Sequence, residues 1–393
     1  MCGRWASDCV GERTGRESAE YGTLLAMDVP RRIVIAPDSF KGSLSAIDVA
    51  AALARGWQSV RPNDTLTRLP QADGGEGTLE AIAATVTDAV LHDCGPVTGP
   101  DGRTTSGAWL ELPGRVGVVE LAQCSGLPLM TTLDPLGATT RGLGEVINSA
   151  LDFGIDSLVV GLGGSASTDG GAGVLAALGL ELRDEEGVRL PDGGYALSRL
   201  ASIDRSHFRA PPTAGVTLLA DVNAPLLGPR GAAAVFGPQK GATPEDAMAL
   251  EAGLARFASL LGGDPTRPGS GAAGGTAYGL ATAWHAHTES GARMLQKLTG
   301  LDAAIAQADV VITGEGRFDE TSTEGKVVGE LLSLDQEHGV RAGIVAGQVA
   351  TTSNAWTCSL ADLAGSAEAA MTDPVPYLER AGATAAQHFV RGE

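Results

Sequence analysis

Five glycine-rich loops hold most of the side chains in this sequence that could do chemistry. These side chains are Asp38 and Lys41, Asp73 and Glu76, Ser165 and Asp169, Asp221 and Lys240, and Glu315, Asp319 and Lys326. Glycines let backbone N–H groups face an anion, and acids beside them can hold Mg²⁺ or act as a general base. Lysines can offset the charge that develops on a transferred phosphoryl group. The combination favours phosphoryl transfer over hydride transfer.

The distribution of lysine supports the same chemistry. Lys41, Lys240 and Lys326 are three of only four lysines in the chain, and all three lie in these loops, whereas the other basic residues are 24 arginines. Lysine offers a compact point charge on a flexible stem and arginine a planar fork, so lysine suits a moving phosphoryl group. Chance is the alternative explanation, because loops are exposed and lysine is a surface residue.

Each loop alone is a weak signal, because an Asp-Gly-Gly sequence is most often a turn. Asp101-Gly102 and Asp192-Gly193-Gly194 lie among polar residues without a preceding buried strand, and we expect both to be plain turns. Val327 follows Gly325-Lys326, so this is not a P-loop sequence. A redox enzyme is disfavoured, because no G-x-G-x-x-G follows a strand with an acid about twenty residues on.

The loops are predicted to join buried strands to helices. Residues 33–36 form a short apolar run that ends at Pro37, and Ser45, with Asp48 three positions on, begins a helix over residues 46–57. A strand over 65–69 and a helix over 78–86 repeat this unit. In an open parallel sheet such loops lie at the carboxyl ends of the strands, where ligands bind.

The middle of the chain has a different pattern. Residues 89–121 alternate between apolar and polar types around a turn at 99–102, which predicts hairpin strands. The glycine-rich segment 268–275 indicates a hinge or linker. Near the end, a strand over 309–313 is followed by a loop over 314–325, and a last helix is expected over 374–391.

We therefore predict an α/β protein of two α/β domains, since 393 residues exceed one ordinary core. Residues 28–70 and 290–393 are expected to form a discontinuous, Rossmann-like domain with a doubly wound parallel sheet. Residues 71–289 are expected to form a mixed α/β domain inserted into it. Residues 1–27 are polar and patternless, and we expect a disordered N-terminal extension, with Met27 as an alternative start of the working chain.

Composition excludes several classes of protein. A net charge of -19 disfavours a nucleic-acid partner, and no apolar run approaches the length of a membrane span. The five cysteines are scattered and form no C-x-x-C pair, which indicates reduced thiols of a cytoplasmic protein rather than a disulfide framework or a zinc site. The sequence leaves open whether the protein is a homo-oligomer.

Six segments resemble the signature motifs of the bacterial glycerate kinases of the type I family. They are residues 36–45 (APDSFKGSLS), 72–78 (ADGGEGT), the glycine loop 161–173, 221–226 (DVNAPL), 235–241 (VFGPQKG) and 314–319 (GEGRFD). The motifs are specific, and the resemblance runs in order from residue 31 to the C-terminus.

The resemblance implies ATP-dependent, Mg²⁺-assisted phosphorylation of D-glycerate in a cleft between two α/β domains, one inserted in the other. It favours 2-phosphoglycerate over 3-phosphoglycerate as the product. The expected partners are therefore two small molecules, D-glycerate and ATP. A kinase of another small hydroxy acid is the nearest alternative. A non-catalytic regulator that binds glycerate or nucleotide on the same fold is the alternative from another class.

Two loops depart from the family pattern. Ala166-Ser167-Thr168-Asp169 stands where the family usually has Ala-Thr-Asn-Asp. Residues 319–326 (DETSTEGK) stand where the family usually has Asp-x-Gln-Thr-x-x-Gly-Lys, so Thr321-Ser322 replaces the Gln-Thr pair. Both acids and Lys326 are retained, but each loop lacks an amide. The departures bear on the identity of the substrate more than on the type of reaction.

Individual roles follow from this resemblance and from the loops. Catalytic roles are predicted for Asp169, Lys41, Asp73 and Lys326, with Asp169 as the favoured base because Ser165 beside it could also contact substrate. Residues predicted to bind substrate or phosphate are Asp38, Ser39, Gly42, Ser43, Gly74, Gly75, Gly163, Gly164, Ser165, Lys240, Gly314, Glu315 and Arg317. Asp221, Asp319 and Glu76 are the predicted Mg²⁺ ligands.

Overall fold

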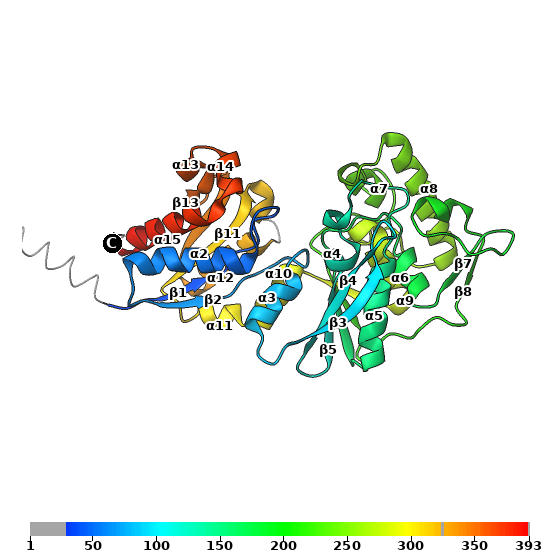
Figure 1. Ribbon diagram of the computed structural model, residues 1–393, viewed down its shortest axis with the longest axis horizontal. Helices are drawn as coiled ribbons and strands as arrows, with labels where there is room; N and C mark the ends of the chain where they lie inside the picture. The colour runs from blue at the N-terminus through cyan, green and yellow to red at the C-terminus, as the bar shows by residue number, and fades with distance from the viewer. Residues whose placement is uncertain (1–28, 324–325, 392–393) are drawn as a thin grey trace, which may run out of the picture.

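A computed structural model describes residues 29–323 and 326–391 of the chain. It has two lobes, each built around its own sheet (Figure 1). The predicted extension over residues 1–27 lies outside the described residues, as do Glu324 and Gly325 of the last glycine loop. No helix of the described part is long and apolar enough to cross a membrane.

The first sheet consists of five parallel strands in the order β13-β12-β11-β1-β2. The strands are β1 (Arg32–Ile35), β2 (Thr65–Arg68), β11 (Val310–Phe318), β12 (Arg341–Val349) and β13 (Trp356–Ser359). Side chains alternate across β1, because successive residues of a strand face opposite sides. Ile33 and Ile35 pack with α2 (Ala46–Val60) and α15 (Pro374–Arg391). Val34 packs with α11 (Leu301–Ile305) and α12 (Val327–His338) on the other face.

The second sheet has six strands in the order β10-β9-β6-β5-β4-β3. The strands are β3 (Val90–Thr98), β4 (Thr104–Leu112), β5 (Val116–Glu120), β6 (Ser157–Gly161), β9 (Val216–Leu219) and β10 (His287–Glu289). Strands β3 and β4 form the predicted antiparallel hairpin, whereas β5, β6, β9 and β10 run parallel. This sheet is therefore mixed, as the sequence predicts.

Helices cover both faces of the second sheet. One face packs with α5 (Arg141–Phe153), α8 (Pro244–Leu261) and α9 (Thr276–Trp284). The other face packs with α3 (Thr78–Thr85) and α10 (Gly291–Thr299), which lie between the lobes in Figure 1. The shorter elements are α4 (Leu121–Ser125), α6 (Ala172–Ala177), α7 (Ala232–Phe236), α13 (Leu360–Ala364), α14 (Ala367–Thr372), and the hairpin of β7 (Glu181–Arg183) and β8 (Ser202–Asp204).

The predicted fold class, two α/β units with one doubly wound parallel sheet, is confirmed by this topology. The domain limits 28–70, 71–289 and 290–393 stay a prediction. Leu295 of α10 lies beyond residue 290 and packs on the second sheet, whereas Leu301 of α11 packs on the first. The chain thus returns to the first lobe near Gly300.

Two assignments made from glycine content were wrong. The predicted loop from Gly314 belongs to β11 as far as Phe318, because β12 pairs with it through Gly314↔Val345 and Arg317↔Gln348. A Cβ at Gly314 would lie 2.1 Å from the Val345 carbonyl oxygen, so this glycine permits strands to approach rather than a chain to turn.

The second wrong assignment is the hinge at 268–275. Its central residues are buried inside the second lobe, where the Gly170 N–H donates to the Gly274 carbonyl at 3.0 Å. A Cβ at Gly274 would lie 2.1 Å from the Ser167 carbonyl oxygen. This segment is packed under the glycine loop that follows β6, and it does not join the two lobes.

Candidate active site

Two chambers of about 410 Å³ each meet where the lobes face one another. The β11 chamber is lined by the loop after β1, by the carboxyl end of β11 and by α13 and α14. The β6 chamber is lined by the glycine loop after β6, by the loop after β9 and by the segment around Lys240. Lys41, Asp73 and Lys326 line both chambers. We call these three residues the junction.

The junction brings three of the four predicted catalytic residues together. Lys41 Nζ lies 3.8 Å from Asp73 Oδ2, and attraction to Asp73 raises the pKa of Lys41. The other Asp73 oxygen, Oδ1, accepts a bond from the Gly75 N–H at 3.2 Å, which orients the carboxylate. Lys326 Nζ donates to Thr321 Oγ1 at 3.0 Å. An anion at the junction would therefore meet two ammonium groups.

Four acids line the β11 chamber: Asp38, Asp73, Glu315 and Asp319. Burial, and then repulsion from Asp73, raises the pKa of Asp38 to about 7. Burial also raises the pKa of Glu315, whose buried Oε1 has no hydrogen-bond partner among residues 29–323 and 326–391. Such an arrangement is unfavourable without a cation, because like charges in a partly buried site repel one another.

Other predicted residues of this chamber are more exposed. Ser39 and Ser43 line its wall. Arg317 lies 3.4 Å from Asp319 Oδ2, and the hydrogen bond from Thr321 lowers the pKa of Asp319. Gly42 lies in an adjoining hollow of about 520 Å³ together with Glu76.

The remaining predicted glycines divide into two groups. Gly163 and Gly164 line the β6 chamber. Gly74, Gly75 and Gly314 are absent from the walls of both chambers in the described chain. Gly74 has a φ of +88°, and a Cβ there would lie 2.8 Å from Leu219 Cβ, while its carbonyl accepts from the Gly163 N–H at 3.0 Å. It joins the loops after β2 and β6 and so positions Asp73.

Ser165 and Lys240 lie side by side in the wall of the β6 chamber. Lys240 Nζ donates to Ser165 Oγ at 2.9 Å and to the Ser167 carbonyl. Lys240 is only 2% exposed, and burial lowers its pKa to about 7.

Asp169 is placed differently from its predicted role as the base. It is fully buried and does not line either chamber. Its Oδ2 accepts from the Thr140 N–H at 3.0 Å, from Thr140 Oγ1 at 2.8 Å and from the Gly173 N–H at 3.1 Å, and its Oδ1 accepts from the Gly171 N–H at 3.1 Å. This carboxylate ties the start of α5 to the glycine loop that precedes α6.

The three predicted Mg²⁺ ligands are not brought together. Asp319 lines the β11 chamber, Asp221 the β6 chamber and Glu76 the adjoining hollow. The prediction took one ligand from each of three glycine loops, but these loops follow different strands. Across residues 29–323 and 326–391, no group of three or more His, Cys, Asp or Glu side chains could hold a metal ion by itself.

Asp221 has features that the sequence did not indicate. Its Oδ1 accepts from the Gly291 N–H at 3.2 Å, and its buried Oδ2 has no hydrogen-bond partner in the part of the chain that the structure describes. Burial is the main cause that raises the pKa of Asp221 to about 6, and repulsion from Asp73 adds to it. A carboxylate of this kind, beside a chamber, is suited to accept a proton near neutral pH.

Sequence reasoning missed two supporting residues. Glu120, at the end of β5, accepts from the Gly77 N–H at 3.1 Å and the Leu79 N–H at 3.0 Å, and so holds the start of α3, which follows the Asp73 loop, to β5. Gly291 begins α10, and a Cβ there would lie 2.0 Å from the Asp73 carbonyl oxygen. Neither lies in a recognisable motif; the one available signal for Glu120 was an acid at the end of a predicted buried strand.

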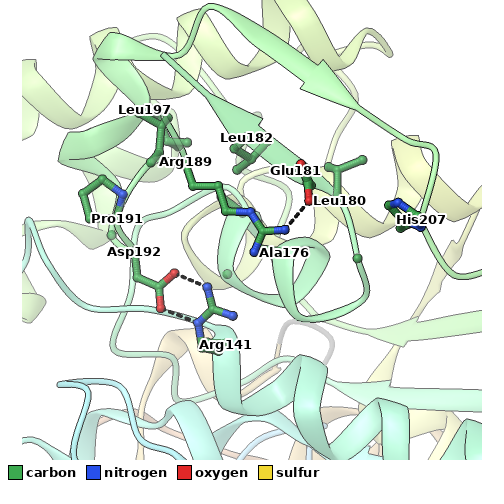
Figure 2. Close-up of a pocket in the computed structure, with 15 residues that line it drawn as sticks. Arg141, Ala176, Leu180, Glu181, Leu182, Arg189, Pro191, Asp192, Leu197 and His207 are labelled. Atoms are coloured by element: carbon green, nitrogen blue, oxygen red, sulfur yellow. Dashed lines mark hydrogen bonds and ion pairs between the residues drawn. The ribbon is translucent and has the colours of Figure 1, made fainter. Parts of the chain in front are cut away.

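A separate pocket of about 190 Å³ lies in the second lobe (Figure 2). It contains none of the predicted site residues, and both of its arginines are paired: Arg141 with Asp192 at 2.6 Å, and Arg189 with Glu181. Asp192 had been assigned to a plain turn, but it holds Arg141 at the start of α5. With its charges matched, this pocket gives no reason to expect an anion.

Comparison with known proteins gives a consistent result. A model of the glycerate kinase family matches residues 33–390. The chain is 40% identical to the glycerate kinase of Bacillus subtilis strain 168, over 82% of this chain and 87% of that protein. It is also 40% identical to the glycerate 2-kinase of Escherichia coli K12, over 75% and 80% of the two chains.

A solved structure agrees with the fold. The crystal structure of a Salmonella typhimurium LT2 protein assigned as a glycerate kinase 2 superposes with a TM-score of 0.76 at 35% identity. The match covers 92% of this chain and 98% of that one.

Proposed function

Since the chain belongs to the glycerate kinase family, we propose that it transfers the γ-phosphoryl group of ATP to D-glycerate in the cleft between its lobes. The observation that carries this proposal is the junction. Two chambers of equal volume open onto the same two lysines and the same aspartate. A donor in one chamber and an acceptor in the other would meet there, and such positioning is the main task in phosphoryl transfer.

The β11 chamber suits the nucleotide. Leu360, Ala370 and Met371 give it an apolar wall on which a base could lie. Lys41, Lys326 and Arg317 supply positive charge at the other end, where phosphates would lie. The β6 chamber, with its glycine loop and Lys240, is left for the smaller acceptor.

The acids of the β11 chamber fit a magnesium ion that arrives with the nucleotide. The orphaned Glu315 Oε1 and the raised pKa of Asp38 both indicate a place where a cation would relieve repulsion. Mg²⁺ bound with nucleotide phosphates needs only one or two carboxylates, which agrees with the absence of a three-ligand cluster among the described residues. Asp38 and Glu315 would hold it, and the ion would neutralise charge on the phosphates.

We assign the proton transfer to Asp221 in place of Asp169. Asp221 lines the acceptor chamber and has a free carboxylate oxygen. It would take the proton of the attacking hydroxyl, while Lys41 and Lys326 offset the charge on the transferred group. Asp73 would keep Lys41 in place through their ion pair.

The test is ³¹P NMR of the protein with Mg²⁺, ATP and D-glycerate. A new phosphomonoester signal with formation of ADP is expected. Coupling of that signal to one proton would identify 2-phosphoglycerate, the product favoured by the name of the Escherichia coli relative, and coupling to two protons would identify 3-phosphoglycerate. If D-glycerate gives no new signal but another small hydroxy acid does, that acid is the substrate and the reaction is still phosphoryl transfer.

A further inference from the structure

We infer that Lys240, together with Ser165, is the receptor for the carboxylate of the acceptor substrate, and that the β6 chamber therefore selects hydroxy acids over uncharged polyols. The inference rests on the proposed function and deepens it, because it names the chemical group that the acceptor must carry and the chamber that receives it.

Lys240 is an exception among the cations of this protein. Two basic side chains are buried in the described residues, Arg61 and Lys240. Arg61 makes two hydrogen bonds to Asp64, at 2.6 and 2.8 Å. Lys240 has no carboxylate within ion-pair distance in the described part of the chain, and its two hydrogen bonds go to a hydroxyl and a carbonyl. A buried ammonium group without a counter-ion is strongly unfavourable, so an anion is expected to complete the site.

No nearby acid can serve as that counter-ion. Asp169 attracts Lys240 from a distance, but its oxygens already accept four hydrogen bonds from Thr140, Gly171 and Gly173. Asp221 and Asp73 line the same chamber and interact repulsively with one another. An anion would avoid these two acids and bind at the Lys240 end.

This polarity orients the acceptor. With its carboxylate on Lys240 and Ser165, a short hydroxy acid would present its hydroxyl groups to the other lining residues, which include Asp221 and the junction. Nucleotide phosphates also carry negative charge, but Lys41 and Lys326 already offer them two partly exposed ammonium groups at the junction. The buried lysine is therefore left to the acceptor.

Binding of the carboxylate should take up a proton. Burial lowers the pKa of Lys240 to about 7, so above that pH the amine is largely neutral in the free protein. A carboxylate would favour the ammonium form. The other charged groups around the chamber are Lys41, Lys326, Asp73, Asp221 and, behind Ser167, Asp169.

The experiment compares wild type with Lys240→Met, and uses Lys297→Met as the matched control, because Lys297 is exposed on α10. Binding of D-glycerate and of its uncharged amide is measured by calorimetry at pH 8, in buffers of different ionisation heat, with Mg²⁺ and a non-hydrolysable ATP analogue at saturation. Binding of the analogue is titrated separately. Ser165→Ala is the second variant, since it removes only a hydroxyl group and should fold if Lys240→Met does not.

Wild type should take up close to one proton per D-glycerate bound and prefer D-glycerate to its amide. Lys240→Met should abolish both effects and weaken D-glycerate binding about 10- to 100-fold, the usual loss for a hydrogen bond to a charged group, with analogue binding within about twofold. Ser165→Ala should show a smaller loss in the same direction. Lys297→Met should match wild type.

Three results would overturn the inference. The first is that Lys240→Met binds D-glycerate and takes up a proton as the wild type does. The second is that Lys240→Met loses binding of the ATP analogue and keeps binding of D-glycerate. The third is that the wild type binds no small hydroxy acid. Failure of the proposed function looks different. If wild type binds a hydroxy acid through Lys240 but the ³¹P spectrum shows no phosphorylated product, the carboxylate receptor stands and the kinase assignment falls.

Discussion

Asp169→Asn separates the role that the sequence predicts for this residue from the role that its surroundings favour. If Asp169 is the catalytic base, the variant should lose turnover by about 10²- to 10⁴-fold, and its stability should change little. If Asp169 is a buried structural carboxylate, the variant should lose stability and keep most of its turnover below the melting temperature. The two expectations differ in which quantity changes, so a single variant distinguishes them.

The size of the stability loss follows from the four hydrogen bonds. Oδ2 accepts three of them and Oδ1 accepts one, from the Gly171 N–H. The amide oxygen of asparagine can replace Oδ2, but its NH₂ group would then face the Gly171 N–H donor to donor. One buried bond is lost, and the Gly171 N–H and the asparagine NH₂ group face each other without an acceptor, which costs about 1–3 kcal/mol. At about 2–4 °C per kcal/mol for a lobe of this size, the melting temperature should fall by about 2–12 °C.

The assay combines calorimetric melting with steady-state kinetics measured well below the transition. Asp152→Asn is the control, because this aspartate is 72% exposed on its side chain and makes only a surface ion pair with Arg209; its melting temperature should stay within about 2 °C. A wild-type melting temperature together with a turnover loss of about 100-fold or more would refute the structural role and restore Asp169 as the base.

Three further predictions concern the chambers and their supports. Asp221→Asn should lower kcat by about 10²- to 10⁴-fold with nucleotide binding retained. Burial raises the pKa of Asp221 to about 6, so the kcat of the wild type should rise with pH through about 6. A near-normal kcat in the variant would exclude Asp221 as the base. Lys41→Arg should lose most turnover despite its kept charge, because the planar fork cannot reproduce a point charge beside Asp73, and full activity would contradict the argument from lysine usage. Burial raises the pKa of Glu120 to about 7, so its contribution to stability is present below its unfolded value and is lost as pH rises through about 7. Melting curves should therefore show that the wild type loses more stability between pH 5 and pH 8 than Glu120→Gln does. Equal losses in the two proteins would contradict the titration of Glu120 in this range.

The parts of the fold that depend on local pattern were predictable. The last helix, Pro374–Arg391, has the expected limits, because apolar periodicity and helix-start residues are local properties of the sequence. Ser45 caps α2 as expected, accepting from the Asp48 N–H at 3.2 Å. The membership of the family was predictable too, since whole motifs carry it.

The site was predictable as a set of loops but not as a geometry. Gly163 and Gly74 look alike in sequence, yet one lines a chamber and the other joins two loops by packing on Leu219. Asp169 and Asp221 each follow a buried strand. Thr140, at a helix start 29 residues away, donates two hydrogen bonds to Asp169. Which acid is free depends on long-range partners, and no local spacing specifies these.

The loop lysines differ in burial, so a single reason for lysine in place of arginine does not apply to all of them. Lys41 has a side chain that is 65% exposed and pairs with Asp73, so it agrees with the idea of a flexible charge that follows a phosphoryl group. Lys240 is 2% exposed, so the alternative that lysines are simply surface residues of exposed loops does not apply to it. Two acceptors, the Ser165 hydroxyl and the Ser167 carbonyl, surround Lys240 Nζ. An arginine would bring five donors in a rigid fork to these two acceptors. The proposed carboxylate receptor would account for lysine at 240, because a buried ammonium group can lose its proton and regain it with an anion, and a guanidinium group cannot.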